Sequence, residues 1–181
     1  MEQVMERMGR VPGNRGERSK VALVFHCCSE AAALSIAETG FANLSRTDPG
    51  YFGQGLYFTL DADYAWEVYG PLVRARGGRP VLVVAWVCMG SVYPVIENPL
   101  STTTVGPGLA GAPNRPGCDT HVVVVRPRGP GSAEWVPCKP EEAGYHEVRT
   151  EVVVFDLAQA LPVAILDADL GGGGRWMWVP M

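Results

Sequence analysis

The chain has 181 residues, of which 47% are hydrophobic and 19% charged, so it can build one globular core and is not disordered over its whole length. A formal net charge of −4, with no block of like charge, excludes the electrostatic footprint of a nucleic-acid-binding protein. The five cysteines are a poor disulfide framework, and no apolar run matches a signal peptide or the roughly 20 residues of a membrane helix, so we expect an intracellular protein, cytoplasmic or nuclear.

The first part of the chain predicts a lead-in, a strand and a helix. Residues 1–19 are polar and charged, which is typical of a flexible segment. The continuous apolar run of residues 21–25 predicts a buried strand. Ser29 is a favourable N-cap and Gly40 a favourable C-cap, so we expect a helix over residues 30–39.

Turn-forming residues separate the next elements. Residues 42–55 predict a loop and residues 56–60 a short strand. Asp61 is expected to cap a helix that ends at Tyr69, before a Gly-Pro pair. The three arginines in residues 74–79 are interrupted by glycines, which favours a solvated loop.

Short strands and long loops fill the second half of the chain. The apolar runs that predict strands are residues 80–89, 121–126, 151–155 and 163–166. Residues 97–120 and 127–144 are rich in proline and glycine and predict long connections, and residues 171–181 form a Gly-rich hinge and an aromatic tail. The expected fold class is therefore α+β, with a mainly antiparallel sheet, two short helices and long loops.

Three segments carry candidate functional residues. The segment VFHCC places His26 at the end of a strand, GYFGQGLYFTLDADYAWEVYG places Tyr57 within a strand, and TEVVVFDLAQALPVAIL places Glu151 at the start of another. In this order and spacing they resemble the poly(ADP-ribose) polymerase-type transferases, the diphtheria-toxin-like group with a His-Tyr-Glu triad. The resemblance implies an ADP-ribosyltransferase catalytic domain over residues 20–170, with the split antiparallel sheet of that fold.

The resemblance also implies a reaction. NAD⁺ would be the substrate, and ADP-ribose would pass to a protein acceptor or to the protein itself, with release of nicotinamide and no metal. Cleavage of the nicotinamide–ribose bond develops oxocarbenium charge, which a nearby carboxylate stabilises. Glu151 is the carboxylate in this role, and His26 would hydrogen-bond the adenosine ribose. Glutamate at this position allows polymer formation without implying it.

The implied NAD⁺-binding set extends beyond the triad. It comprises His26, Cys27, Arg46, Tyr51, Gly55, Tyr57 and Tyr69. The backbone of Cys27 would hold the nicotinamide amide, and the rings of Tyr57 and Tyr69 would enclose the nicotinamide. The loop of residues 42–54 would close over the dinucleotide, with Tyr51 and Arg46 near the phosphates.

Two departures from the family pattern keep alternatives open. Cys27 and Cys28 stand where the family has Gly followed by Ser or Thr, and Ala65 stands where it often has Ser. Both changes are expected to weaken NAD⁺ binding, because a side chain hinders close backbone approach and Ala65 cannot hydrogen-bond the amide. One alternative is a catalytically silent module that binds NAD⁺ or ADP-ribose. Another is an NAD⁺ glycohydrolase that uses water as acceptor.

Other chemistry-bearing residues have weaker functional interpretations. A zinc site is conceivable from the set Cys118, His121, Cys138 and His146, but the second half of that set lacks the spacing of common structural zinc sites. A redox pair of Cys27 and Cys28 is disfavoured because adjacent cysteines bridge poorly. Isolated tryptophans such as Trp135 do not by themselves indicate a partner surface.

Overall fold

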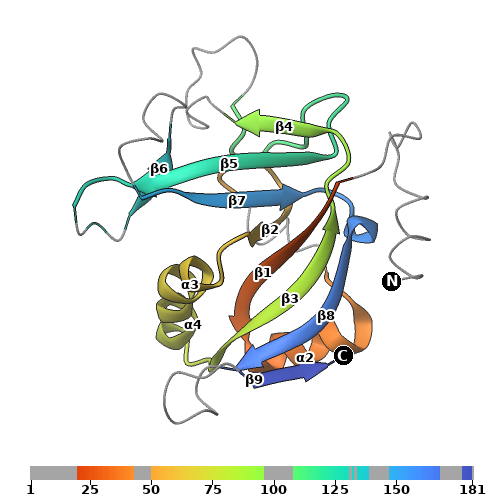
Figure 1. Ribbon diagram of the computed structural model, residues 1–181, viewed down its shortest axis with the longest axis vertical. Helices are drawn as coiled ribbons and strands as arrows, with labels where there is room; N and C mark the ends of the chain where they lie inside the picture. Colours follow the sequence, from red (N-terminus) through yellow and green to blue (C-terminus); the bar gives the residue numbers. More distant parts are fainter. Residues whose placement is uncertain are drawn as a thin grey trace.

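The computed structural model describes residues 20–42, 50–95, 108–130, 132, 134–138, 147–167 and 177–180. The fold is α+β, with a mixed, mostly antiparallel sheet and two helical runs, as the pattern of short apolar segments predicts (Figure 1). The strands are β1 (Val21–Ser29), β2 (Leu56–Thr59), β3 (Pro80–Cys88), β4 (Val92–Val95), β5 (Thr120–Pro127), β6 (Trp135–Pro137), β7 (Arg149–Val154), β8 (Ala160–Asp167) and β9 (Met177–Pro180). No helix in these described ranges is long and apolar enough to cross a membrane.

Strands β1 and β2 share the fewest paired residues of the described sheet. Its strand order is β4-β5-β7-β2-β1-β3-β8-β9, with β6 paired to β5, and among the described strands only β4 and β5 pair in parallel. Within the described residues, the β1–β2 ladder consists of the single pair Phe25 and Thr59. In Figure 1, β4, β5 and β7 therefore lie across the top of the molecule, while β1, β3 and β8 run below them.

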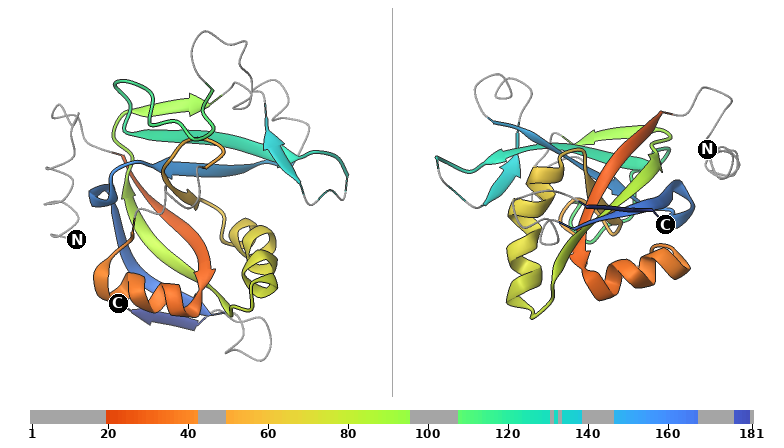
Figure 2. Two further views of the ribbon diagram at one scale, coloured as in Figure 1. Left: turned by 180° about the vertical axis from the view of Figure 1, so that it is seen from behind. Right: turned by 60° about the horizontal axis from the view of Figure 1, so that its bottom comes forward.

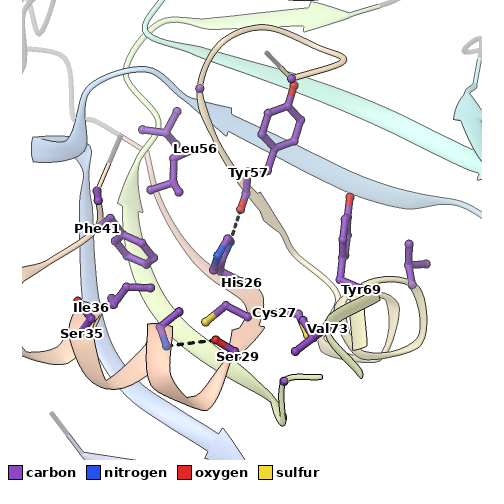
Figure 3. Close-up of a pocket in the computed structure, with 18 of the residues that line it drawn as sticks. His26, Cys27, Ser29, Ser35, Ile36, Phe41, Leu56, Tyr57, Tyr69 and Val73 are labelled. Carbon is purple, nitrogen blue, oxygen red and sulfur yellow. Dashed lines mark hydrogen bonds between the residues drawn. The ribbon is translucent and has the colours of Figure 1, made fainter. Parts of the chain in front are cut away.

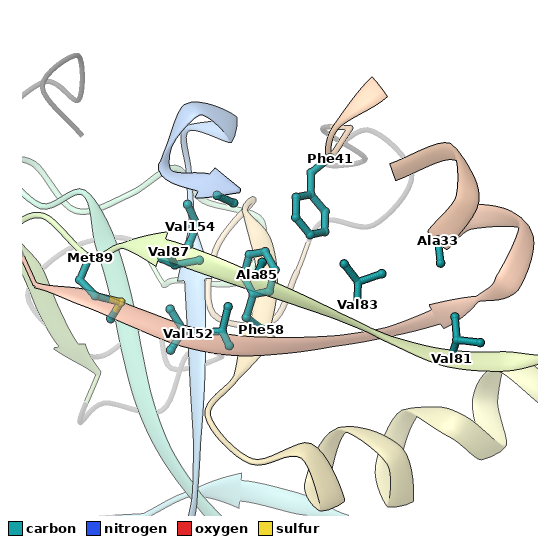
Figure 4. Packing of buried hydrophobic residues seen from close by; sticks show 12 residues of the cluster. Ala33, Phe41, Phe58, Val81, Val83, Ala85, Val87, Met89, Val152 and Val154 are labelled. Carbon is teal, nitrogen blue, oxygen red and sulfur yellow. The ribbon is translucent and has the colours of Figure 1, made fainter. Parts of the chain in front are cut away.

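Helix α2 (Glu30–Thr39) has the predicted bounds and caps. The Ser29 hydroxyl accepts a hydrogen bond from Ala32 N–H at 3.3 Å, and Gly40, with φ of 82°, donates its N–H to the Ile36 carbonyl. Buried Ala33 packs against Val81 and Val83 in the main core cluster (Figure 4). The cap residues and the apolar face therefore fix this helix against β3.

The second helical run is longer than the sequence predicted. It begins with α3 (Ala62–Tyr64), continues as a π-helical turn η1 (Ala65–Tyr69) and ends with α4 (Gly70–Ala75). The predicted end at Tyr69 is wrong because Pro71 lies in the first turn of α4. Proline is tolerated in a first turn, where the backbone N–H groups have no partner within the helix. The run lies on the opposite side of β1 and β3 from α2 (Figure 2).

Two further expectations for this run are corrected. Asp61 makes no side-chain cap on α3; its carboxylate accepts instead from Thr150 N–H at 3.4 Å. Arg74 is not in a loop but in α4, where its guanidinium carbon lies 4.9 Å from the centroid of the Trp66 ring. The side chain of Arg79 bridges Glu30 and Asp167, so it also contributes to the fold rather than facing solvent freely.

The segment after β7 is held by its polar residues. Asp156 and Gln159 form a capping box around the short 3₁₀ helix η3 (Leu157–Gln159). The buried Gln159 amide also donates to the Cys88 carbonyl at 2.9 Å and to the Thr120 hydroxyl at 3.1 Å. Asp156 and Gln159 therefore have a structural role.

Three strands were not predicted. β4 and β6 are short, and Pro94 lies in β4 at the edge of the sheet, where a proline does not interrupt a ladder. β9 lies inside the predicted aromatic tail and pairs with β8. Pairing with an existing strand edge, rather than local propensity, defines all three.

Gly55 offers a test of how closely β2 approaches β7. A Cβ at Gly55 would lie 2.5 Å from Val153 Cγ1 and 2.7 Å from the Val154 carbonyl oxygen. We expect Gly55→Ala to lower the free energy of unfolding by about 1–3 kcal/mol, measured by urea denaturation. Gly129→Ala is the matched control, because a Cβ there meets nothing within 4 Å. Equal stability of both variants would show that Gly55 is not required for packing.

Candidate functional site

The described members of the predicted site line one cavity. This cavity has a volume of about 1320 Å³ and lies where β1, β2, β7 and the two helical runs meet (Figure 3). The predicted residues that line it are His26, Cys27, Tyr51, Gly55, Tyr57, Tyr69 and Glu151. Arg46 lies outside the described residues. The parting of β1 from β2 thus brings residues from distant parts of the chain to one hollow.

His26 is tied to the neighbouring strand. Its Nδ1 donates a hydrogen bond to the Tyr57 carbonyl at 2.8 Å, and its ring lies edge-on to Phe41 and Phe58. Burial lowers the pKa of His26, against the Tyr57 hydrogen bond, which raises it. The neutral imidazole with its proton on Nδ1 leaves Nε2 as an acceptor, suited to a ligand hydroxyl.

Tyr57 contributes its ring to the cavity and its hydroxyl to the loop. The hydroxyl accepts from Phe52 N–H at 2.7 Å and donates to the Gly53 carbonyl at 2.9 Å. Gly53 has a φ of 126°, which favours glycine at this bend. The sequence assigned Tyr57 only a ligand-facing role, and the structure adds that it holds the loop at the cavity wall.

Glu151 is a buried carboxylate rather than a solvated charge at a strand start. Its exposed fraction is 6%, and its Oε1 accepts hydrogen bonds from Tyr64 Oη at 2.5 Å and Tyr69 Oη at 2.8 Å. Burial raises the pKa of Glu151, while the two hydroxyl bonds lower it. In the described part of the chain no lysine, arginine or histidine forms an ion pair with it.

Tyr64 is a site residue that the sequence analysis missed. It belongs to α3, lines the same cavity, and packs edge-on against Trp135 with ring centroids 4.7 Å apart. Burial raises the pKa of both Tyr64 and Tyr69, and the neighbouring Glu151 raises them further, so both hydroxyls stay protonated as donors. The available signal was an aromatic residue on each side of Ala65 in the predicted helix.

The departures from the family pattern lie directly at the site. Cys27 and Ala65 line a small cavity of about 50 Å³, together with His26, Tyr57 and Tyr69. Ala65 is buried and lines this cavity, so a serine there would place its hydroxyl at the cavity wall. Tyr57 and Tyr69 both border it, and their predicted stacking on either face of a nicotinamide remains a prediction.

The two adjacent cysteines are protonated thiols at neutral pH. Burial raises the pKa of Cys27 to about 11, although Arg74 opposes the shift, and burial raises the pKa of Cys28 to about 12. Cys28 also packs against the main core cluster. At Cys27 burial outweighs the effect of Arg74, and at Cys28 the neighbouring Cys27 adds to the upward shift, so neither thiol is activated in the way of a reactive cysteine.

His121, a member of the hypothetical zinc set, is occupied by backbone groups. It is fully buried, its Nδ1 donates to the Phe52 carbonyl at 2.8 Å, and its Nε2 accepts from Arg115 N–H at 3.0 Å. No group of three candidate metal ligands occurs within the ranges that the structure describes, and His146 lies outside them. With both ring nitrogens engaged, His121 cannot ligate a metal in this arrangement.

Comparison of the chain with protein-family models and with curated proteins gives no match. The functional interpretation therefore depends on the residues and on the geometry of the cavity.

The state of Cys27 is testable by alkylation. With a thiol pKa of about 11, about one part in ten thousand is thiolate at pH 7. We expect alkylation of Cys27 by iodoacetamide to accelerate roughly tenfold per pH unit between pH 7 and 10, followed by peptide mass spectrometry. Cys27→Ser identifies the signal. A plateau near pH 8 would show an activated thiol and contradict the assignment.

Proposed function

We propose that this protein is an ADP-ribosyltransferase that transfers ADP-ribose from NAD⁺ to a protein acceptor, or to itself, and releases nicotinamide. The observation that carries the proposal is the buried Glu151 carboxylate without a cationic partner among the described residues, in one cavity with His26 and Tyr57. The sheet that opens between β1 and β2 also fits the split sheet implied by the family resemblance.

The chemistry follows from the charge of the site. When the bond between the nicotinamide nitrogen and ribose C1′ breaks, the electron pair leaves with nicotinamide and the ribose becomes an oxocarbenium ion. Glu151, a carboxylate with only 6% of its surface exposed, stabilises that positive charge at short range. The acceptor then bonds to C1′, and its proton passes to Glu151, whose raised pKa suits it to take a proton.

The size and lining of the cavity suit a dinucleotide. A volume of about 1320 Å³ exceeds the roughly 300–1,000 Å³ typical of small-ligand pockets. The lining extends from Glu151 past His26 to Ser29 and Thr39 at the two ends of α2. The Nε2 acceptor of neutral His26 is suited to a ribose hydroxyl in the middle of this path.

Two other functions use the same cavity. A silent binding module is favoured by Cys27 and Ala65, because the alanine leaves the nicotinamide amide one hydrogen bond short. An NAD⁺ glycohydrolase would use the same carboxylate with water as acceptor. Nicotinamide release separates the enzyme from the silent module, and labelled NAD⁺ followed onto protein separates transfer from hydrolysis.

Glu151→Gln tests the carboxylate. The amide oxygen can still accept from Tyr64 and Tyr69, but the negative charge is lost. We expect nicotinamide release to fall by about 10²–10³, or about 2.7–4 kcal/mol, while NAD⁺ affinity measured by calorimetry changes little. Glu147→Gln, an exposed carboxylate before β7, is the control. Full activity of Glu151→Gln would refute this role.

His26→Ala tests ground-state binding. The substitution removes the bond to the Tyr57 carbonyl as well as the acceptor for a ribose hydroxyl. We expect NAD⁺ affinity to fall by roughly tenfold or more, together with turnover. Circular dichroism and thermal unfolding establish that the variant is folded. Unchanged affinity in a folded variant would make His26 a core histidine only.

A further inference from the structure

Two tyrosine hydroxyls converge on one oxygen of Glu151. Tyr64 Oη and Tyr69 Oη lie 2.5 and 2.8 Å from Oε1, and Oε2 takes no hydrogen bond from the described residues. We propose that Tyr64 is a positioning residue which, together with Tyr69, fixes the Glu151 carboxylate by Oε1 and leaves Oε2 to face the ribose. This inference rests on the proposed function for the identity of the ligand, but its geometry does not.

The π-helical turn makes the convergence possible. Tyr64 and Tyr69 are five residues apart, and in a regular α-helix such residues point about 140° away from each other. In a π-helix the hydrogen bonds run from i to i+5 and each turn holds more residues, which brings the two side chains closer to the same side. The turn η1 covers Ala65–Tyr69, the interval that separates the two rings. The irregular helix therefore has a specific effect on the site.

Packing restrains Tyr64 from moving with the ligand. Its exposed fraction is 2%, and its ring contacts Trp135 from β6 and Tyr69 from η1, both edge-on. Tyr69 is half-buried and borders both cavities, so it can contact a ligand as well as Glu151. The two tyrosines share one hydrogen-bond acceptor, but Tyr64 also packs against the ring of Trp135, which restrains it.

The described groups that surround Glu151 are mostly uncharged. From the helical run it faces Tyr64 and Tyr69, and Tyr57 of β2 lies near Tyr69. Two residues earlier on β7, Arg149 approaches Asp61 and pairs with Glu147. β5 places Val123 opposite Glu151, β2 places Thr59 there, and neither carries a charge.

Loss of either tyrosine hydroxyl is expected to change the pKa of Glu151, which distinguishes the positioning role from a purely structural one. Both hydroxyl bonds lower the pKa of Glu151, so loss of either donor raises this pKa. The ionised carboxylate then disappears at a higher pH as the solution is acidified. The acid limb of the pH–rate profile should move upward, whereas looser packing that admits water would move it downward, because burial is what raises this pKa.

The experiment compares Tyr64→Phe with the parent protein in two independent measurements. The first is a ¹³C NMR titration of glutamate carboxyl groups in the intact protein, with the Glu151 signal assigned from Glu151→Gln. The second is the pH dependence of nicotinamide release. We expect the carboxyl pKa and the acid limb to rise together and kcat to fall roughly tenfold, while KM for NAD⁺ stays near the parental value.

Two further variants complete the test. Tyr69→Phe keeps its ring but loses its hydroxyl, so it should raise the carboxyl pKa in the same direction even if Tyr64→Phe proves too unstable to study. Tyr93→Phe removes a phenol hydroxyl from β4, away from the cavity lining, and should leave the titration unchanged.

The outcomes separate the inference from the proposed function. An unchanged Glu151 pKa in the folded Tyr64→Phe and Tyr69→Phe variants overturns the positioning role. A raised KM with an unchanged kcat in Tyr64→Phe makes Tyr64 a ligand contact and also overturns it. If the carboxyl pKa rises in the variants but the parent releases no nicotinamide at any pH, the positioning of Glu151 by Tyr64 and Tyr69 is supported and the proposed transferase activity is wrong.

Discussion

The hydrogen bond from His26 Nδ1 to the Tyr57 carbonyl is the contact on which the cavity depends. It follows Phe25 and Thr59, the single pair that joins β1 to β2 in the described part of the chain, at the place where the sheet opens. A buried backbone carbonyl needs a donor, and here a side chain supplies it. The same bond fixes the tautomer of His26, and burial favours the neutral ring, so Nδ1 has the structural role and Nε2 is left as an acceptor.

The wall opposite α2 is held from two sides at Phe52. Its N–H donates to the Tyr57 hydroxyl, and its carbonyl accepts from His121 Nδ1. His121 in turn accepts from Arg115 N–H, so the connection between residues 108 and 119 is joined to the same loop. Tyr57 and His121, which the sequence suggested as functional residues, therefore help to shape the cavity. His121 does so through both ring nitrogens and Tyr57 through its hydroxyl.

Local signals predicted the parts of the fold that local interactions determine. Ser29 and Gly40 bracket α2 correctly because both caps act within one turn. The second helical run was too short in the prediction, since Pro71 can begin a helix as well as end one. His26, Tyr57 and Glu151 could be selected from their order in the sequence. The burial of Glu151 and its contact with Tyr64 could not, because both depend on strand pairing and on a π-helical turn.

The choice of partners for Glu151 is consistent with a site that acts on positive charge. An arginine or lysine would lower the pKa of the carboxylate strongly, but it would also cancel the negative potential. Two neutral hydroxyls on Oε1 orient the group and partly offset the cost of burying it, without contributing positive charge. The compensation is incomplete, as the raised pKa of Glu151 shows. In the proposed reaction, the oxocarbenium ion would be the cation that the protein itself does not place beside Oε2.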